Sequence, residues 1–287
     1  MVVIRTGKMK DCRDLLTVYQ TTRWYHGVRP NGYKTVEQVK DEHRDVGFKR
    51  WGWLVAELDG KVVGEIVFRI EKNPSSGKLG IIRNLDIDVR FQKKEIGTQL
   101  TRAAEDTLRN RGAVRVVLTT PPEAYNYWMK IGYFARGSLL RISVDLNDVP
   151  IDRSRNLERS RLDNEPPISK KFLFSNIAYP GLLVDCIREI IMEGKPGRIV
   201  KFNLDSKYAG MGVIYKKNVE VAEFVVDATK FGISELESMT RKTLGLARNW
   251  TVEAVSGIVP KGSFSLYQKS APWSSELARE IPVTRIL

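Results

Sequence analysis

Cysteine and histidine are scarce in this sequence. Each occurs only twice, as Cys12, Cys186, His26 and His43. Because the cysteines stand far apart and no Cys/His cluster has metal-ligand spacing, the sequence argues against a disulfide framework and against a structural zinc site. We expect two buried thiols in a reducing, cytoplasmic compartment.

Long apolar runs and long basic runs are also missing. No apolar run approaches the roughly 20 residues that cross a membrane. The first ten residues, MVVIRTGKMK, lack the apolar core of a signal peptide. We therefore expect no membrane-bound segment, and no basic tail of the kind that binds nucleic acid.

The net charge, by contrast, is strongly positive. Lys and Arg number 47 against 34 Asp and Glu, which leaves a formal charge of +13. Such an excess favours polyanionic partners, which include a phosphate-rich cofactor, nucleic acid and an acidic surface. A general preference for basic residues throughout a proteome is the alternative explanation.

The length and composition fit two domains. The chain has 287 residues, of which 42% are hydrophobic, and this is enough to fill two cores of ordinary size. Residues 146–171 are polar, densely charged and marked by prolines, and we interpret them as a linker. The expected domains are residues 1–145 and 172–287.

Local patterns in the first half predict an α/β fold with a mixed sheet. A strand at 2–5 precedes a helix at 11–25 and a second helix, which Thr35 caps and which continues to about Lys49. The dipeptide Asp59-Gly60 joins two β-rich runs as a hairpin. The next elements alternate strand and helix, at 79–90, 96–112, 113–120, 121–132 and 133–146.

The second half repeats this order. Residues 85–113 and 224–252 each span a strand, a helix and the next strand at the same length. We interpret this agreement as a weak internal repeat, with an unrelated α/β domain as the alternative. The other expected elements are helices and strands at 182–191, 198–204, 211–217, 219–228, 234–247 and 251–258.

A basic turn leads into the helix that begins near Gly97. The turn reads QKKEIG, and the segment EAYNYWMKIGY follows at 123–133. Together they resemble the GNAT acyltransferase superfamily, whose members carry a Q/R-x-x-G-x-G/A turn between a strand and a helix. Gln92 and Gly97 match this motif, whereas Glu95 stands in the place of its first glycine. The resemblance covers residues 1–145.

The resemblance implies a site for acetyl-CoA. The amides at the helix start would hold the pyrophosphate, helped by the positive end of the helix dipole. The strand before the turn would diverge from its neighbour and leave backbone groups for the pantetheine arm. The expected cofactor residues are Ile87, Val89, Gln92, Lys93, Lys94, Glu95, Ile96, Gly97 and Thr98.

Glu95 is the departure that needs an explanation. A residue other than glycine costs little here if the turn keeps a negative φ, with the carboxylate directed to solvent or to Lys93 or Lys94. A carboxylate directed inward would repel the pyrophosphate and weaken binding.

The resemblance also implies groups that move protons. A substrate amine must lose a proton before it attacks the thioester. Glu65 on the hairpin and Asp86 or Asp88 on the cofactor strand are the candidate bases, and a solvated carboxylate is the alternative for each. The place of the family's tyrosine acid holds Trp128, which we expect in the core. The acid is then Tyr127 or Tyr125, or it is unnecessary because a thiolate with a pKa of about 8.5 leaves unaided.

These patterns predict an N-acyltransferase that moves an acetyl group from acetyl-CoA to a primary amine of a small molecule, peptide or protein. A loop at 25–34 is expected on the acceptor side, where Arg23, Arg29 and Lys34 would favour acidic acceptors. The alternative is a non-catalytic GNAT-like module that binds nucleic acid or a protein partner, and homodimerisation through a strand edge is a third reading. The second half has one glycine in its corresponding turn, Gly232, and we expect a degenerate GNAT-like copy there.

Overall fold

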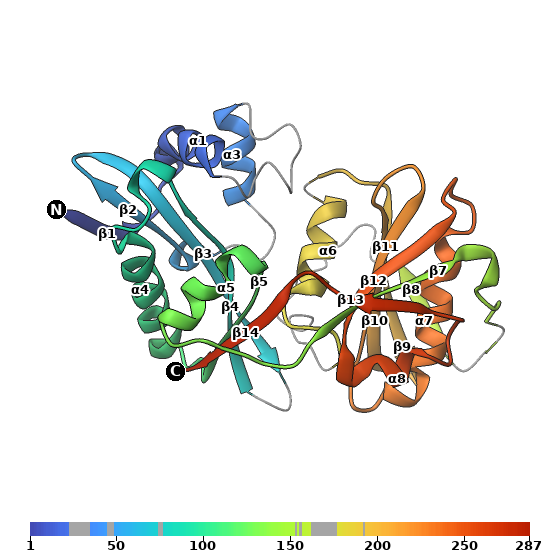
Figure 1. Cartoon of the computed structure of the whole chain (residues 1–287). Coiled ribbons are helices and arrows are strands. Elements are labelled where there is room, and N and C mark those ends of the chain that lie inside the picture. Colours follow the sequence, from blue (N-terminus) through green and yellow to red (C-terminus); the bar gives the residue numbers. More distant parts are fainter. Residues whose placement is uncertain are drawn as a thin grey trace. The chain divides into compact units, whose positions relative to one another are not determined.

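The computed structural model contains two seven-stranded sheets and describes eight stretches of the chain (Figure 1). The described residues are 1–22, 35–44, 49–73, 77–152, 154, 157–161, 177–191 and 193–287. One compact unit comprises Met1–Glu71, Ser76–Leu118 and Arg285–Leu287, and the other comprises Lys72–Ser75 and Thr119–Thr284. The predicted α/β class is confirmed, and Cys12 and Cys186 are both free and buried.

The first sheet has β4 and β5 as a parallel pair near its centre. Its strands, in spatial order, are β1 (Val2–Thr6), β2 (Trp53–Leu58), β3 (Lys61–Asn73), β4 (Gly77–Ile87), β5 (Arg115–Thr120), β14 (Ile281–Ile286) and β6 (Phe134–Ala135). The helices of this half of the chain are α1 (Cys12–Thr21), α3 (Val36–His43), α4 (Ile96–Asn110) and α5 (Pro122–Lys130).

Local sequence signals account for most of these boundaries. Asp59 and Gly60 have φ values of 51° and 78°, as a two-residue hairpin turn requires. Thr35 caps α3 and forms a capping box with Gln38. Gly112 has a φ of 81° and follows α4. The helix α3 ends at His43 rather than near Lys49, and residues 45–48 lie outside the described part.

The second sheet repeats the strand order of the first. In spatial order its strands are β8 (Leu157–Arg161), β9 (Gly197–Leu204), β10 (Lys207–Lys216), β11 (Val221–Ala228), β12 (Ala254–Pro260), β7 (Leu139–Asp145) and β13 (Ser274–Leu277). β11 and β12 are parallel, like β4 and β5. The helices are α6 (Leu182–Ile191), α7 (Leu236–Leu244) and α8 (Phe264–Tyr267). The predicted repeat of element order is therefore confirmed.

The two sheets exchange one strand each, which the sequence did not predict. The strand β7 lies in the second sheet between β12 and β13, and β14 takes the corresponding place in the first sheet between β5 and β6. The prediction that residues 1–145 form one sheet is therefore wrong. β6 has only two residues and is too short to pair along the seven residues of β7, which instead pairs on both its edges.

The segment predicted as a linker is partly built into the second core. Among its described residues, Leu146, Val149 and Leu157 are buried in the cluster that fills the second sheet. Leu157 begins β8, which pairs with β9 in an antiparallel ladder. Within the predicted linker, residues 146–171, these three apolar side chains therefore pack in the second core.

Candidate functional site

The predicted divergence of two parallel strands is present in the first sheet. The ladder between β4 and β5 joins Leu79 to Arg115 and ends at the pair Ile81 and Val117. Among the described residues, β4 from Ile82 to Ile87 has no ladder to β5. Backbone groups on this side of β4 are placed where an extended ligand can pair with them.

The strand ends at Ile87, three residues earlier than the sequence predicted. Asp88 caps a short 3₁₀ helix, η3 (Val89–Phe91), by accepting the N–H of Arg90 at 3.0 Å. Val89 therefore lies in this helix, 46% exposed, and its predicted place on the strand is wrong. Asp88 is buried and its side-chain hydrogen bonds from Arg90 lower the pKa of its carboxyl group, which makes Asp88 a paired anion rather than a base.

The side chain of Gln92 connects the turn to the end of the strand. Its Nε2 donates to the carbonyl oxygen of Ile87 at 3.1 Å. A carbonyl oxygen has two lone pairs, so the Ile87 carbonyl can accept one further hydrogen bond. The ammonium of Lys94 lies 5.1 Å from the centre of the Phe91 ring, and Lys93 is exposed. The turn thus presents two cations at the end of the diverging strand.

Glu95 adopts a backbone conformation that favours glycine. Its φ is 60° and its ψ is 3°, in the left-handed region, so the negative φ under which a side chain would cost little is not what the turn adopts. This geometry explains why a glycine at this place would suit the turn, and a side chain here costs roughly 1–2 kcal/mol. The Glu95 side chain is exposed, and among the described residues it forms no ion pair with Lys93 or Lys94.

The start of α4 offers an anion site. Its cap residue, Glu95, makes no side-chain hydrogen bond to the helix, and no acidic residue lies in the first turn. The N–H groups of Ile96, Gly97 and Thr98 have no acceptor one turn earlier in the helix, as at every helix start. With fifteen residues, α4 has a full dipole whose positive end lies at these amides.

Glu65 lies in a buried polar cluster on the other side of β4. Its side chain is 0% exposed, on β3. It accepts hydrogen bonds from the Tyr19 hydroxyl of α1, from His43 Nε2 of α3 at 2.8 Å and from Trp53 Nε1 of β2 at 2.7 Å. One carboxylate therefore joins both helices to the two hairpin strands.

His43 is held as an imidazolium by this cluster. Its Nδ1 lies 2.7 Å from the Val39 carbonyl oxygen, so that both ring nitrogens face acceptors. Burial acts to lower the pKa of His43, but the charge of Glu65 and the hydrogen bonds of the ring outweigh it and raise the pKa from 6.5 to about 10. The preceding residue, Glu42, pairs with Arg83 of β4 at 3.0 Å. Two adjacent residues thus attach α3 to β3 and to β4.

Asp86 and Tyr127 complete the set of predicted catalytic residues. Asp86 is 6% exposed and directly precedes Ile87 at the end of β4. Tyr127, on α5, contacts Trp128 edge to face at a centroid distance of 5.1 Å. Trp128 is buried and contacts Tyr133, which confirms its predicted place in the core. α5 belongs to the second compact unit.

Sequence reasoning missed three members of the Glu65 cluster. Tyr19, His43 and Trp53 were not singled out, although His43 follows the buried Val39 by one helical turn and histidine is rare in this chain. That spacing was the one available signal. Arg23, Arg29, Lys34 and the loop at 25–34 lie outside the described residues.

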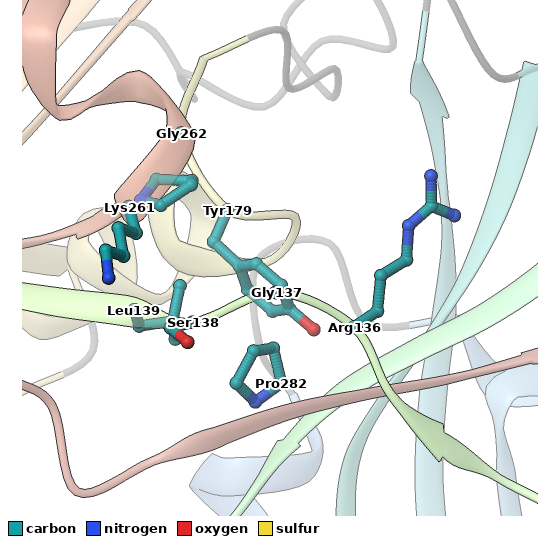
Figure 2. Close-up of a pocket in the computed structure, with 9 residues that line it drawn as sticks. Arg136, Gly137, Ser138, Leu139, Tyr179, Lys261, Gly262 and Pro282 are labelled. Carbon is teal, nitrogen blue, oxygen red and sulfur yellow. The ribbon is translucent and has the colours of Figure 1, made fainter.

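The second unit contains a separate pocket of about 430 Å³. Its lining residues are Arg136, Gly137, Ser138, Leu139, Tyr179, Pro260, Lys261, Gly262 and Pro282, none of which belongs to the predicted site. Burial raises the pKa of Tyr179 and the charge of Arg136 acts in the opposite direction. Figure 2 shows the side chains of Arg136 and Lys261 extending away from the Tyr179 ring on opposite sides.

In the part of the chain that the structure describes, no helix is both long enough and apolar enough to span a membrane. No protein among the curated sequences matches the chain.

Solved structures share the fold of the whole chain at low sequence identity. A GCN5-related N-acetyltransferase from Anabaena variabilis has a TM-score of 0.68 and 12% identity over 100% of this chain and 73% of its own. One from Kribbella flavida has a TM-score of 0.59 and 14% identity over 100% and 71%. A tandem GNAT protein from the clavulanic acid biosynthesis pathway has a TM-score of 0.51 and 11% identity over 100% and 98%.

The match with the tandem protein agrees with the repeated strand order of the two sheets. The model of the acetyltransferase (GNAT) family matches residues 17–133. This segment contains the diverging strands, the turn and the buried Glu65 cluster. Residues 17–133 therefore match the GNAT acetyltransferase family.

Proposed function

We propose that this protein is an N-acyltransferase that transfers an acetyl group from acetyl-CoA to a primary amine of a small molecule, peptide or protein. The observation that carries the proposal is the position of the turn. It joins the end of a strand that diverges from its neighbour to the start of α4, within the segment that the family model matches. A strand edge and a helix start in this order suit an extended amide chain that ends in a pyrophosphate.

The residues of the turn fit the charges of coenzyme A. The N–H groups of Ile96, Gly97 and Thr98 would hold the pyrophosphate, because they are unsatisfied within the helix and lie at its positive end. Lys93 and Lys94 would add positive charge. Gln92 would keep the Ile87 carbonyl oriented towards the pantetheine arm, since it already donates to that oxygen at 3.1 Å. The bound cofactor supplies the reactive thioester.

Three side chains would share the handling of protons. A primary ammonium has a pKa of about 10, so a base must take a proton before the amine can attack. We assign this role to Asp86, at the end of the cofactor strand. The Glu65 carboxylate already accepts three hydrogen bonds, so it would act through His43 and Tyr19 as a positioning group. Tyr127 would donate a proton to the leaving thiolate.

Calorimetry and an acetyl-transfer assay test the proposal. Acetyl-CoA should bind to the wild-type protein, and failure to bind at millimolar cofactor would contradict the proposal. With an accepted amine, Asp86→Asn should lower kcat by about 10²- to 10⁴-fold with the cofactor Kd unchanged. Asp106→Asn, which changes an exposed carboxylate on α4, is the matched control and should leave kcat unchanged.

A further inference from the structure

The second sheet contains a second pair of diverging parallel strands. β11 and β12 pair from Val221 and Ala254 to Phe224 and Gly257, and among the described residues their ladder goes no further. The rest of β11, Val225–Ala228, corresponds in strand order to the end of β4 that has no ladder to β5 among the described residues. The second half thus has the same framework for a cofactor as the first.

A side chain of the protein itself occupies this second divergence. Tyr267, the last residue of α8, is 1% exposed, and its hydroxyl donates to the carbonyl oxygen of Val226 at 2.8 Å. Trp273 fixes it there, because its Nε1 donates to the Tyr267 carbonyl at 3.0 Å and its ring stacks on Phe224 at a centroid distance of 5.4 Å. The strand group that a ligand would approach is therefore already paired.

The next residue of β11 holds a second segment against the strand end. The buried carboxylate of Asp227 accepts the N–H of Ile177 at 2.8 Å and of Ala178 at 3.1 Å. Breaking two hydrogen bonds from backbone amides to one buried carboxylate is costly, because both bonds stabilise the buried charge. The end of β11 is thus covered by the chain's own residues.

Three amides of the segment after β11 donate to backbone carbonyl groups. The N–H of Thr229 donates to the Ala209 carbonyl at 2.8 Å, that of Gly232 to the Thr229 carbonyl at 3.0 Å and that of Glu235 to the Gly232 carbonyl at 3.0 Å. A Cβ on Gly232 would lie 2.1 Å from the Ala209 oxygen, so the turn lies directly against β10. The helix that follows carries Glu237 in its first turn, where α4 has no acidic residue.

We propose that Tyr267 and Asp227 close the second half to coenzyme A, so that each chain binds one cofactor molecule, at the turn of the first half. The Tyr267 hydroxyl takes the place at β11 that a pantetheine amide would take at β4. This inference rests on the function proposed above, because it presupposes that the first turn binds the cofactor.

Calorimetric titration with coenzyme A tests the inference through its stoichiometry. The wild-type protein should bind one molecule per chain, and Gly97→Asp should bind none, with its fold checked by circular dichroism and thermal unfolding. Two exposed lysines provide a matched pair, one in each turn. Lys94→Asp should weaken binding about tenfold or more, because it places a negative charge beside the phosphates, whereas Lys230→Asp should leave the Kd within about twofold.

The possible failures are distinct. Two molecules per chain in the wild type, one molecule remaining in folded Gly97→Asp, or a Kd weakened by Lys230→Asp would overturn the inference and leave the proposed function in place. A wild-type protein that binds no coenzyme A at millimolar concentration would instead overturn the proposed function itself, and the inference with it.

Discussion

At the scale of single residues, Glu95 and Glu65 show how a carboxylate's surroundings determine what it can do. Glu95 is exposed and lies in a left-handed backbone conformation, so its cost is one of backbone strain rather than of charge burial. Glu65 is fully buried, and its charge is balanced by three hydrogen-bond donors, one of which is the imidazolium of His43. A carboxylate without such partners would be destabilising in the same place.

Glu95→Gly should stabilise the protein. Glycine adopts the left-handed region without strain, but it also makes the unfolded chain more flexible, so we expect a net gain of up to about 1 kcal/mol. Urea unfolding measures the gain. Lys94→Gly, a neighbour in the same turn whose φ is not positive, is the control and should give no gain. A destabilised Glu95→Gly variant would contradict the backbone assignment.

The same variant addresses cofactor binding. Because the Glu95 side chain is exposed, its removal should change the Kd for coenzyme A by less than about threefold at both low and high salt. A gain of tenfold or more that shrinks with added salt would mean that the carboxylate lies beside the phosphates in the complex.

The pair of His43 and Glu65 should make stability depend on pH in the alkaline range. The pKa of His43 is raised in the folded protein from 6.5 to about 10, so the folded state binds this proton more tightly than the unfolded state. The stabilisation is complete below pH 6.5 and is lost as the pH rises towards 10. Urea midpoints measured from pH 6 to about pH 10 should fall through this window.

Glu65→Gln supplies the comparison for this pH dependence. At neutral pH it should destabilise the fold by about 3–5 kcal/mol, because it leaves the buried imidazolium without its anion. The alkaline decline that His43 causes should be absent from the variant, so the difference in stability between wild type and variant should shrink as the pH rises towards 10. A variant that retains the wild-type decline would show that another group causes it.

At the scale of elements, the parts predicted from sequence are those whose signals are local. The Asp59-Gly60 hairpin, the Thr35 cap and the end of α4 before Gly112 each depend on residues within one turn of the feature. The Glu65 cluster depends on partners 12 to 46 residues away, which no local pattern can place together. Val89 was misplaced because strand alternation continues through Asp88, whereas the Asp88 side chain caps a turn instead.

The close approach of β3 to β4 depends on the absence of a side chain at Gly64. A Cβ at Gly64 would lie 2.5 Å from Ile87 Cδ1 and 2.8 Å from the Asp86 carbonyl oxygen, at the cofactor end of β4. Gly64→Ala should therefore destabilise the fold by about 1–3 kcal/mol and also weaken coenzyme A binding, because it displaces the strand backbone.

Gly80→Ala is the matched control for this effect. A Cβ at Gly80 would meet the Leu108 side chain at 2.5 Å, in the part of β4 that is paired with β5. It should cost stability without changing the Kd for coenzyme A. Equal losses of binding in both variants would show that binding follows stability in general rather than the position of β4 at Ile87.

At the scale of the whole molecule, the exchange of β7 and β14 decides how the chain can be divided. The domain boundary expected after residue 145 was based on the polar, charged and proline-marked composition of residues 146–171. Pairing between strands distant in sequence cannot be deduced from alternation alone, and here it places β7 in one sheet and β14 in the other. The segments 1–145 and 172–287 each carry a strand of the other sheet.

Two truncated chains test this exchange. A chain of residues 1–145 lacks β14 and should not unfold cooperatively. A chain of residues 1–136 joined by a short Gly/Ser linker to 279–287 regains the strand between β5 and β6, and should show a cooperative transition by circular dichroism. Cooperative unfolding of the first chain alone would contradict the strand order.

The most direct measurement is a crystal structure of the wild-type protein grown with millimolar coenzyme A. We predict density for one molecule per chain, with its pyrophosphate at the N–H groups of Ile96, Gly97 and Thr98 and its pantetheine arm beside β4 near Ile87. Coenzyme A density at β11 near Tyr267 or in the Tyr179 pocket would contradict the account. So would the absence of coenzyme A density from a crystal in which the turn is open to solvent.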